Sequence, residues 1–78
     1  MAVTSLDLAD TGDHCLVLEV SNDNAELQSR LYALGVIPGA VVKILRFAPL
    51  GDPMQVKVGG SFISIRKAEA AIIQVDTQ

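Results

Sequence analysis

The central stretch of the chain, residues 30–53, has the sequence RLYALGVIPGAVVKILRFAPLGDP and contains the strongest signals for turns and element boundaries. The stretch opens as the end of a helix, and Gly35 after an apolar-periodic run fits the left-handed residue that ends a helix. Val36 would then contact Leu31, as in a Schellman motif. Pro38-Gly39 suits a type II turn, because proline presets φ and glycine supplies the positive φ. These residues therefore predict a helix stop, a tight turn, a strand and a loop bracketed by prolines.

A strand is predicted over residues 40–48, AVVKILRFA. Val42 and Ile44 share one face of it, whereas Leu45 and Phe47 share the other. Strict alternation would expose one of these apolar pairs. We therefore expect a bulge or a sharp bend near residues 44–45, a device by which small barrels turn corners.

The helix that precedes this strand is short, over about residues 24–34. Asp23 followed by Glu26 has the spacing of a capping box, although Asp replaces the usual Ser or Thr. An apolar stripe recurs at i, i+4 and i+7 and consists of Leu27, Leu31 and Leu34. A helix of this length is marginal alone in water, so we expect the stripe to dock on a sheet.

The remaining elements are also short. Residues 5–8 form a turn whose leucines would cover one end of the core. Alternation and β-branched content predict strands at 14–20, 54–58, 61–66 and 72–75, with a hairpin at Gly59-Gly60 and one helical turn at 67–71. About five strands with one inserted helix indicate a mainly β fold, a small closed barrel.

Composition allows one domain over residues 1–78, because half of the residues are hydrophobic and this length leaves no room for a second core. The single cysteine excludes an internal disulfide and suits a reducing cytoplasm. The first eleven residues lack a basic start and are not typical of a signal peptide. No apolar run approaches the ~20 residues of a membrane helix, so we expect no direct membrane insertion.

Charge is distributed unevenly under a net charge of −3. Residues 1–29 carry six acidic side chains and no Lys or Arg, whereas all six basic residues lie within 30–67. One interpretation is ordinary strand surface, on which polar side chains alternate outward. The other is a basic face that meets an acidic partner or anionic lipid headgroups.

Residues suited to catalysis are scarce. His14 is the one histidine, and strand neighbours point to opposite faces, so His14 and Cys15 cannot chelate one ion together. Cys15 is typical of a small buried hydrophobe. The glycines form no phosphate loop, and Asp52 suits a turn, with recognition on an exposed loop as the alternative. We therefore expect no enzyme, no cofactor and no tight metal site.

Nucleic-acid binding is also disfavoured by composition. Proteins that stack bases combine aromatic side chains with a basic groove. The aromatic residues here are only Tyr32, Phe47 and Phe62, and the pI is about 4.7. The same shortage argues against an aromatic-lined groove for proline-rich peptides.

Three motifs resemble the FeoA family, the small cytoplasmic proteins of bacterial ferrous-iron uptake. They are LGVIPGA at 34–40, RFAPLGDP at 46–53 and ISIRKAEAAIIQV at 63–75, and the likeness covers about residues 12–75. The resemblance implies an SH3-like barrel with one short helix inserted between the first and second strands. Periodicity alone indicates only a small, mostly β domain.

The resemblance further implies an accessory or regulatory protein that docks on the cytoplasmic side of the membrane transporter FeoB. Our candidate contact residues are Arg30, Leu31, Lys43 and Arg46, although a leucine on a helix stripe is usually core. The alternative is a stand-alone SH3-like module related to the C-terminal domain of metal-dependent transcription regulators. Weak self-association and weak surface binding of a transition metal ion stay open.

Overall fold

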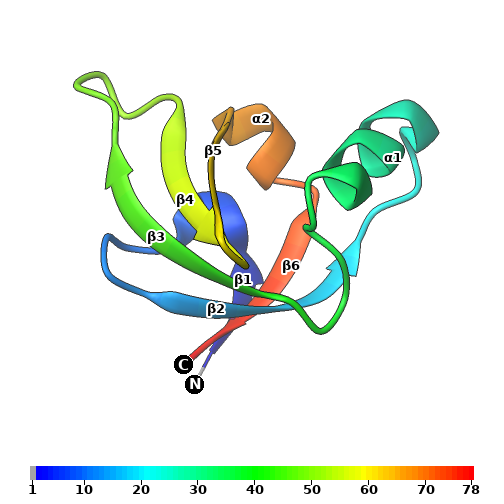
Figure 1. Cartoon of the computed structure of the whole chain (residues 1–78), viewed down its shortest axis with the longest axis horizontal. Helices are drawn as coiled ribbons and strands as arrows, with labels where there is room; N and C mark the ends of the chain where they lie inside the picture. The colour runs from blue at the N-terminus through cyan, green and yellow to red at the C-terminus, as the bar shows by residue number, and fades with distance from the viewer. Residues whose placement is uncertain (1) are drawn as a thin grey trace.

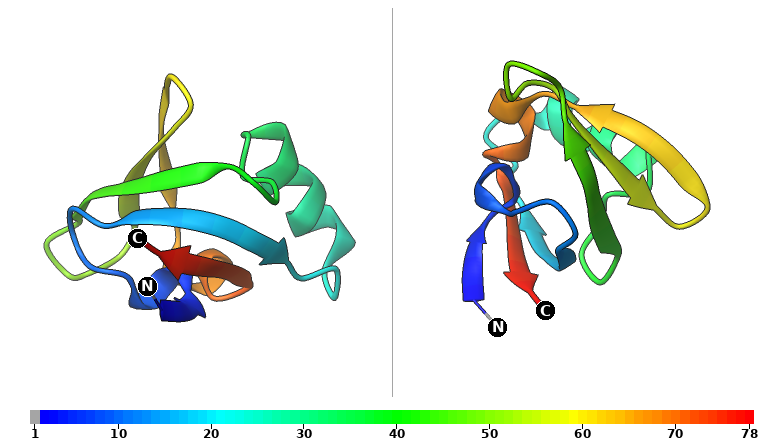
Figure 2. Two further views of the ribbon diagram at one scale, coloured as in Figure 1. Left: turned by 90° about the horizontal axis from the view of Figure 1, so that it is seen from below. Right: turned by 90° about the vertical axis from the view of Figure 1, so that its left-hand side faces the viewer.

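The computed structural model describes residues 2–78. The strands are β1 (Ala2–Ser5), β2 (His14–Val20), β3 (Val41–Phe47), β4 (Met54–Val58), β5 (Ser61–Ile65) and β6 (Ile73–Thr77). The helices are α1 (Ala25–Ala33) and α2 (Lys67–Ala70), with a 3-10 turn, η1 (Leu6–Leu8), after β1. The strands form one antiparallel sheet in the order β1-β6-β2-β3-β4-β5. The sheet curls around the core, and both helices lie at the end opposite the chain termini (Figures 1 and 2).

The mainly β prediction is confirmed, with one strand more than the five expected. The added strand, β1, pairs with β6 from Ala2↔Thr77 to Ser5↔Gln74. Its sequence, AVTS, is too short and too polar to show a strand pattern, and its partner lies at the far end of the chain. The closure expected of the barrel is not made by backbone pairing. In the sheet of residues 2–78, β1 and β5 pair on one side only and remain edges.

Helix α1 ends as the sequence predicts. Gly35 has φ +93°, and its N–H donates to the Tyr32 carbonyl at 3.0 Å. The Val36 N–H donates to the Leu31 carbonyl at 2.9 Å, which completes a Schellman motif. Leu31 and Val36 are both buried, so the helix stop also closes part of the core.

The turn and the bulge that follow α1 are confirmed too. Gly39 has φ +93°, and the Ala40 N–H donates to the Ile37 carbonyl at 3.0 Å, as a type II turn requires. The β3–β4 register shifts between Ile44 and Arg46, which places the bulge at the predicted position. Strand β3 therefore bends at this bulge, where strict alternation would have exposed an apolar pair.

The start of α1 differs from the prediction by one residue. Asn24 is the N-cap, and its Oδ1 accepts a hydrogen bond from the Leu27 N–H at 3.1 Å. Asp23 lies before the helix, where its N–H donates to the Ser21 hydroxyl at 3.2 Å. Both Asp and Asn cap helices well, so spacing alone could not choose between them.

A single core fills the curve of the sheet. Every strand except β1 contributes buried apolar side chains, and α1 contributes Leu31. The leucine stripe of α1 docks only in part, because Leu34 is 41% exposed. In η1 only Leu6 is buried, whereas Leu8 is 69% exposed, against the expectation that both cover the core. With about three residues per turn, a 3-10 turn sends positions two apart to different sides.

Candidate functional site

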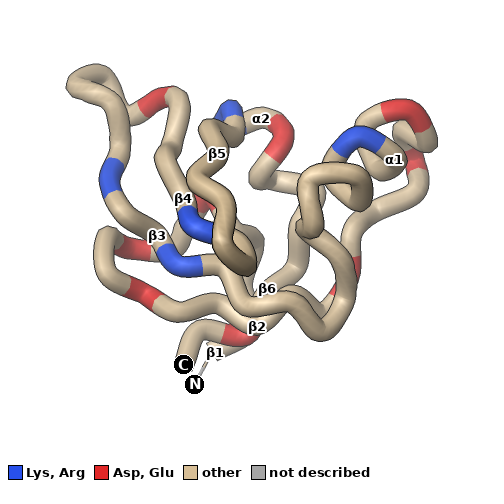
Figure 3. Tube along the Cα trace, viewed as in Figure 1, with Lys and Arg blue, Asp and Glu red and all other residues tan. Residues whose placement is uncertain are grey.

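The four predicted contact residues lie on two separate parts of the molecule. Arg30 and Leu31 belong to α1, whereas Lys43 and Arg46 belong to β3. Figure 3 shows the basic segment of α1 well apart from the basic segments of β3 and β4. Leu31 is 1% exposed, so its side chain belongs to the core beneath the helix. The structure therefore divides the expected contact face into a helix part and a strand part.

A groove runs between α1 and the free edge of β5. Its first part is a cleft of about 400 Å³ whose lining comes from α1, β5, α2 and the loop before β4: Arg30, Leu31, Leu34, Pro53, Ser64, Ile65, Arg66 and Glu69. Strand β5, SFISI, carries no charge and pairs only with β4. Such an edge presents unpaired backbone N–H and C=O groups to any extended segment that approaches it.

The groove widens beyond Leu34 into an apolar hollow of about 700 Å³. This second part lies between the turn after α1 and the β4–β5 hairpin, and Leu34 lines both parts. Leu34, Ile37 and Val41 are 41%, 43% and 48% exposed, so apolar carbons face solvent along it. Contiguous exposed apolar surface of this kind marks interaction sites. The sequence did not single out Leu34 and Ile37 as exposed residues, although both flank a turn that keeps them from the core.

An ion pair closes one end of the groove. The Arg30 guanidinium contacts the Glu69 carboxylate and so links α1 to α2. The second oxygen of Glu69 accepts a hydrogen bond from the Arg66 N–H at 3.0 Å. The Arg30 side chain is 61% exposed, so the pair adds little stability but orients its two partners. Arg30 and Glu69 therefore place a paired charge at the rim of the groove.

The candidate chemical groups are held apart. Cys15 is fully buried, and burial, with a smaller contribution from Asp13, raises the pKa of its thiol to about 11. His14 is exposed at the start of β2. Within residues 2–78, no three His, Cys, Asp or Glu side chains are grouped so that they could hold a metal ion. Neither helix in that range has the length and apolar character needed to cross a membrane.

Solved structures identify the class of domain. The chain is similar to the FeoA of Stenotrophomonas maltophilia complexed with zinc, which is described as a prokaryotic SH3 domain protein. The two are 28% identical over 94% of this chain and 89% of that one, with a TM-score of 0.82. The fold is thus that of a small SH3-like domain. A manganese-dependent transcriptional repressor is 15% identical over 100% of this chain and 38% of its own, with a TM-score of 0.90, which shows likeness of fold alone.

The particular family follows from the sequence match. The model of the FeoA domain matches residues 4–77, and the chain belongs to the FeoA family. The FeoA protein of Chlorobium tepidum is 39% identical over 95% of this chain and 70% of that one, with a TM-score of 0.84. A Porphyromonas gingivalis protein, described as an Fe(2+) transport protein A/Fe(2+) transporter FeoB fusion, is 27% identical over 66 residues. The match takes in 85% of this chain but 8% of that protein's length.

Proposed function

We propose that this chain is an accessory protein of bacterial ferrous-iron uptake, without catalysis of its own, that docks on the cytoplasmic side of a FeoB-type transporter. The observation that carries this proposal is the fused relative, in which a segment similar to this chain and a FeoB transporter share one polypeptide. Fusion holds two partners at a high effective concentration, which is useful only where they act together. The chain would then reach the inner face of the cytoplasmic membrane through its partner.

The groove between α1 and β5 is the docking surface that this function needs. Its apolar hollow suits an extended partner segment, and the free edge of β5 can add that segment as a further strand. The exposed Arg30–Glu69 pair would lie at the rim of the contact, where charged groups set register more than affinity, and Leu31 would support the floor from below. Two of the four predicted contact residues thus belong to this surface, and Lys43 and Arg46 do not line it.

The test is capture of the detergent-solubilised transporter by the immobilised chain. Leu34→Glu places a charge in the groove at a half-exposed position and should reduce capture at least tenfold, which is about 1.4 kcal/mol. Leu8→Glu is the matched control, because Leu8 is exposed on η1 and outside the groove. Both variants should melt close to the parent. Equal capture by the two variants would exclude the groove as the docking surface.

A second candidate function is a stand-alone SH3-like module that serves a metal-dependent transcription regulator. The likeness of fold to the manganese-dependent repressor favours it, without sequence support. Capture from cell extract separates the two candidates. The transport role expects a large membrane transporter among the bound proteins, whereas the regulator role expects a DNA-binding protein in its place.

A further inference from the structure

A basic row crosses the outer face of the sheet from β2 to β4. Backbone register places His14 opposite Lys43, and Lys43 opposite Lys57. Side chains that are directly opposite on neighbouring strands lie about 4.5–5.5 Å apart at Cβ, and like charges there destabilise a sheet. The next residue of the row, on β5, is Phe62, which is 71% exposed. The chain thus keeps an unfavourable lysine pair beside an exposed aromatic ring.

Within residues 2–78, the cations of this face form no ion pair with a carboxylate. The one ion pair formed within residues 2–78 joins α1 to α2, far from the row. Arg46, also on β3, donates from its Nε to the neutral Gln55 side chain at 2.7 Å. The Lys57 ammonium lies 5.7 Å from the centre of the Phe62 ring. We call His14, Lys43, Arg46, Lys57 and Phe62 the basic face.

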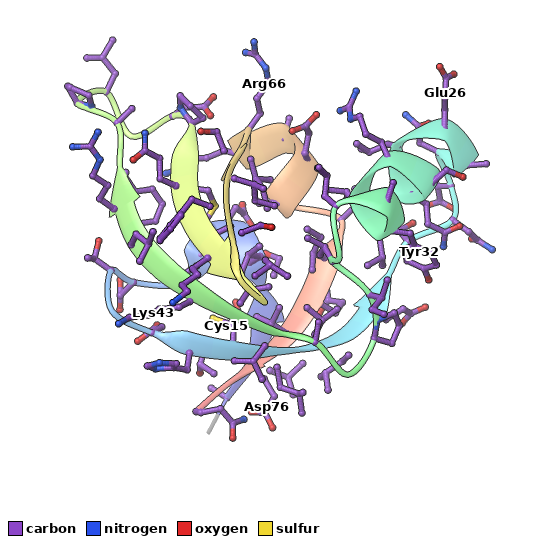
Figure 4. All side chains as sticks on the ribbon, in the orientation of Figure 1. Cys15, Glu26, Tyr32, Lys43, Arg66 and Asp76 are labelled. Carbon is purple, nitrogen blue, oxygen red and sulfur yellow. The ribbon has the colours of Figure 1, made fainter. Side chains whose placement is uncertain are left out.

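The acidic residues Asp13 and Asp76 form no ion pair with the basic face among the described residues. Asp13 precedes β2, and its carboxylate accepts a hydrogen bond from the Asp10 N–H at 2.9 Å. Asp76 lies opposite Leu16 on β6, beyond β2 from the lysine pair. Figure 4 shows Lys43 projecting from β3, away from Asp76 at the end of the molecule where the termini lie. Both lysines are exposed, and neither forms an ion pair with a carboxylate within residues 2–78.

We propose that the basic face docks on an anionic lipid surface, with Phe62 at the level of the headgroups. The proposal rests on the proposed function, which places the chain beside a membrane transporter. Lys43, Arg46 and Lys57 line none of the clefts described above but project from a sheet surface, which suits the spread charge of a membrane better than one peptide. Basic side chains near an anionic leaflet are each attracted to it, and exposed aromatic rings favour the interface.

This arrangement would orient the domain. The basic face consists of residues of β2–β5, whereas the groove is built against α1, and none of the cations of the basic face lines the groove. A domain that rests on lipid through its sheet would keep the groove free for a protein segment. A few cations give weak binding, so the lipid contact would strengthen a protein contact rather than replace it.

The experiment is sedimentation of the purified full chain with vesicles of phosphatidylcholine alone or with about a third of phosphatidylglycerol. We expect binding only to the anionic vesicles, with loss of binding at high salt. Lys43→Gln with Lys57→Gln should weaken binding roughly tenfold or more. The matched control, Arg30→Gln with Arg66→Gln, removes the same charge elsewhere and should bind like the parent. Phe62→Ser should weaken binding at each salt concentration at which the parent still binds.

Three outcomes would overturn the proposal. The first is that the parent does not bind anionic vesicles. The second is that the two double variants weaken vesicle binding equally. The third is that the lysine double variant loses capture of lipid-free transporter but binds vesicles like the parent. The last would assign the basic face to an acidic protein surface. Failure here leaves the transport role intact if the transporter is still captured through the groove. Vesicle binding without any transporter capture would instead remove the proposed function and keep the lipid contact.

Discussion

The Asp52 carboxylate accepts a hydrogen bond from the backbone N–H of Lys67, with 3.0 Å between Oδ1 and N. Asp52 belongs to the proline-bracketed loop before β4, and Lys67 is the first residue of α2. The contact caps the short helix from a distant loop and holds the loop against it. The Lys67 ammonium also lies 5.3 Å from the centre of the Phe47 ring. Asp52 thus acts as more than a turn residue, and its side chain already has a partner within the fold.

Asp52→Ala should lower the free energy of unfolding by about 1 kcal/mol, because a helix N–H loses its acceptor. For a domain of this size that corresponds to about 4–8 °C in melting temperature. Asp52→Asn is the control, since the amide keeps an oxygen that can accept the bond. Thermal melting followed by circular dichroism checks both variants. Equal melting of the parent and the alanine variant would show that this contact adds no stability.

Gly35→Ala should cost about 1–2 kcal/mol, because a residue with a Cβ resists the φ of +93° found there. The added Cβ would lie 3.4 Å from Val58 Cγ1, an ordinary van der Waals contact, so the cost comes from the backbone conformation. Gly60→Ala is the matched control, since Gly60 has no positive φ and nothing lies within 4 Å of its Cβ position. Chemical denaturation measures both. A control that is as destabilised as Gly35→Ala would argue against the left-handed helix stop.

Stability should fall between about pH 9 and pH 11 because of Cys15. Burial, with a smaller effect of Asp13, raises the pKa of the thiol from 9.0 to about 11. The folded state then holds a proton that the unfolded state has lost, so its stability decreases as pH rises through that interval. Cys15→Val should remove this part of the pH dependence. The measurement is the difference in melting temperature between parent and variant along a pH series. A constant difference would contradict the shift.

Ferrous iron should not bind tightly to the isolated chain. In the part of the chain that the structure describes, no cluster of His, Cys, Asp or Glu could supply three ligands. Anaerobic calorimetric titration should therefore show no stoichiometric site of submicromolar affinity. Weak binding through exposed His14 is compatible with this expectation, and His14→Ala should abolish it. A tight site that survives His14→Ala would require ligands that the fold does not bring together.

Lys43→Glu should leave the fold intact and stabilise it slightly, by about 0.2–1 kcal/mol, because it turns a like-charged cross-strand pair into an opposite one. Lys43→Gln should fall between parent and glutamate variant. The measurement is the melting temperature of the three proteins. Vesicle binding should be strongest for the parent, weaker for Lys43→Gln and weakest for Lys43→Glu. A destabilised glutamate variant would mean that Lys43 and Lys57 do not repel one another in the folded protein.

Features that depend on neighbouring residues could be predicted from the sequence. The helix stop at Gly35, the turn at Pro38-Gly39 and the alternation of β4 were predicted and observed, because backbone preferences and side-chain alternation act over a few residues. The bulge at Ile44 was also predictable, since the sequence shows two apolar pairs on opposite faces. The family resemblance extended these local features to an SH3-like domain, which the comparisons confirm.

Features that depend on segments far apart in the chain could not be predicted, because they arise from packing. The pairing of β1 with β6 joins the two ends of the chain, and no pattern in the sequence AVTS predicts this pairing. The groove exists because α1 packs next to the edge of β5 without covering it. The lysine pair exists because the β3–β4 register sets Lys43 opposite Lys57. Arg30 lies on α1, apart from these lysines on β3 and β4. Neighbouring residues set local conformation, whereas packing sets which side chains share a surface.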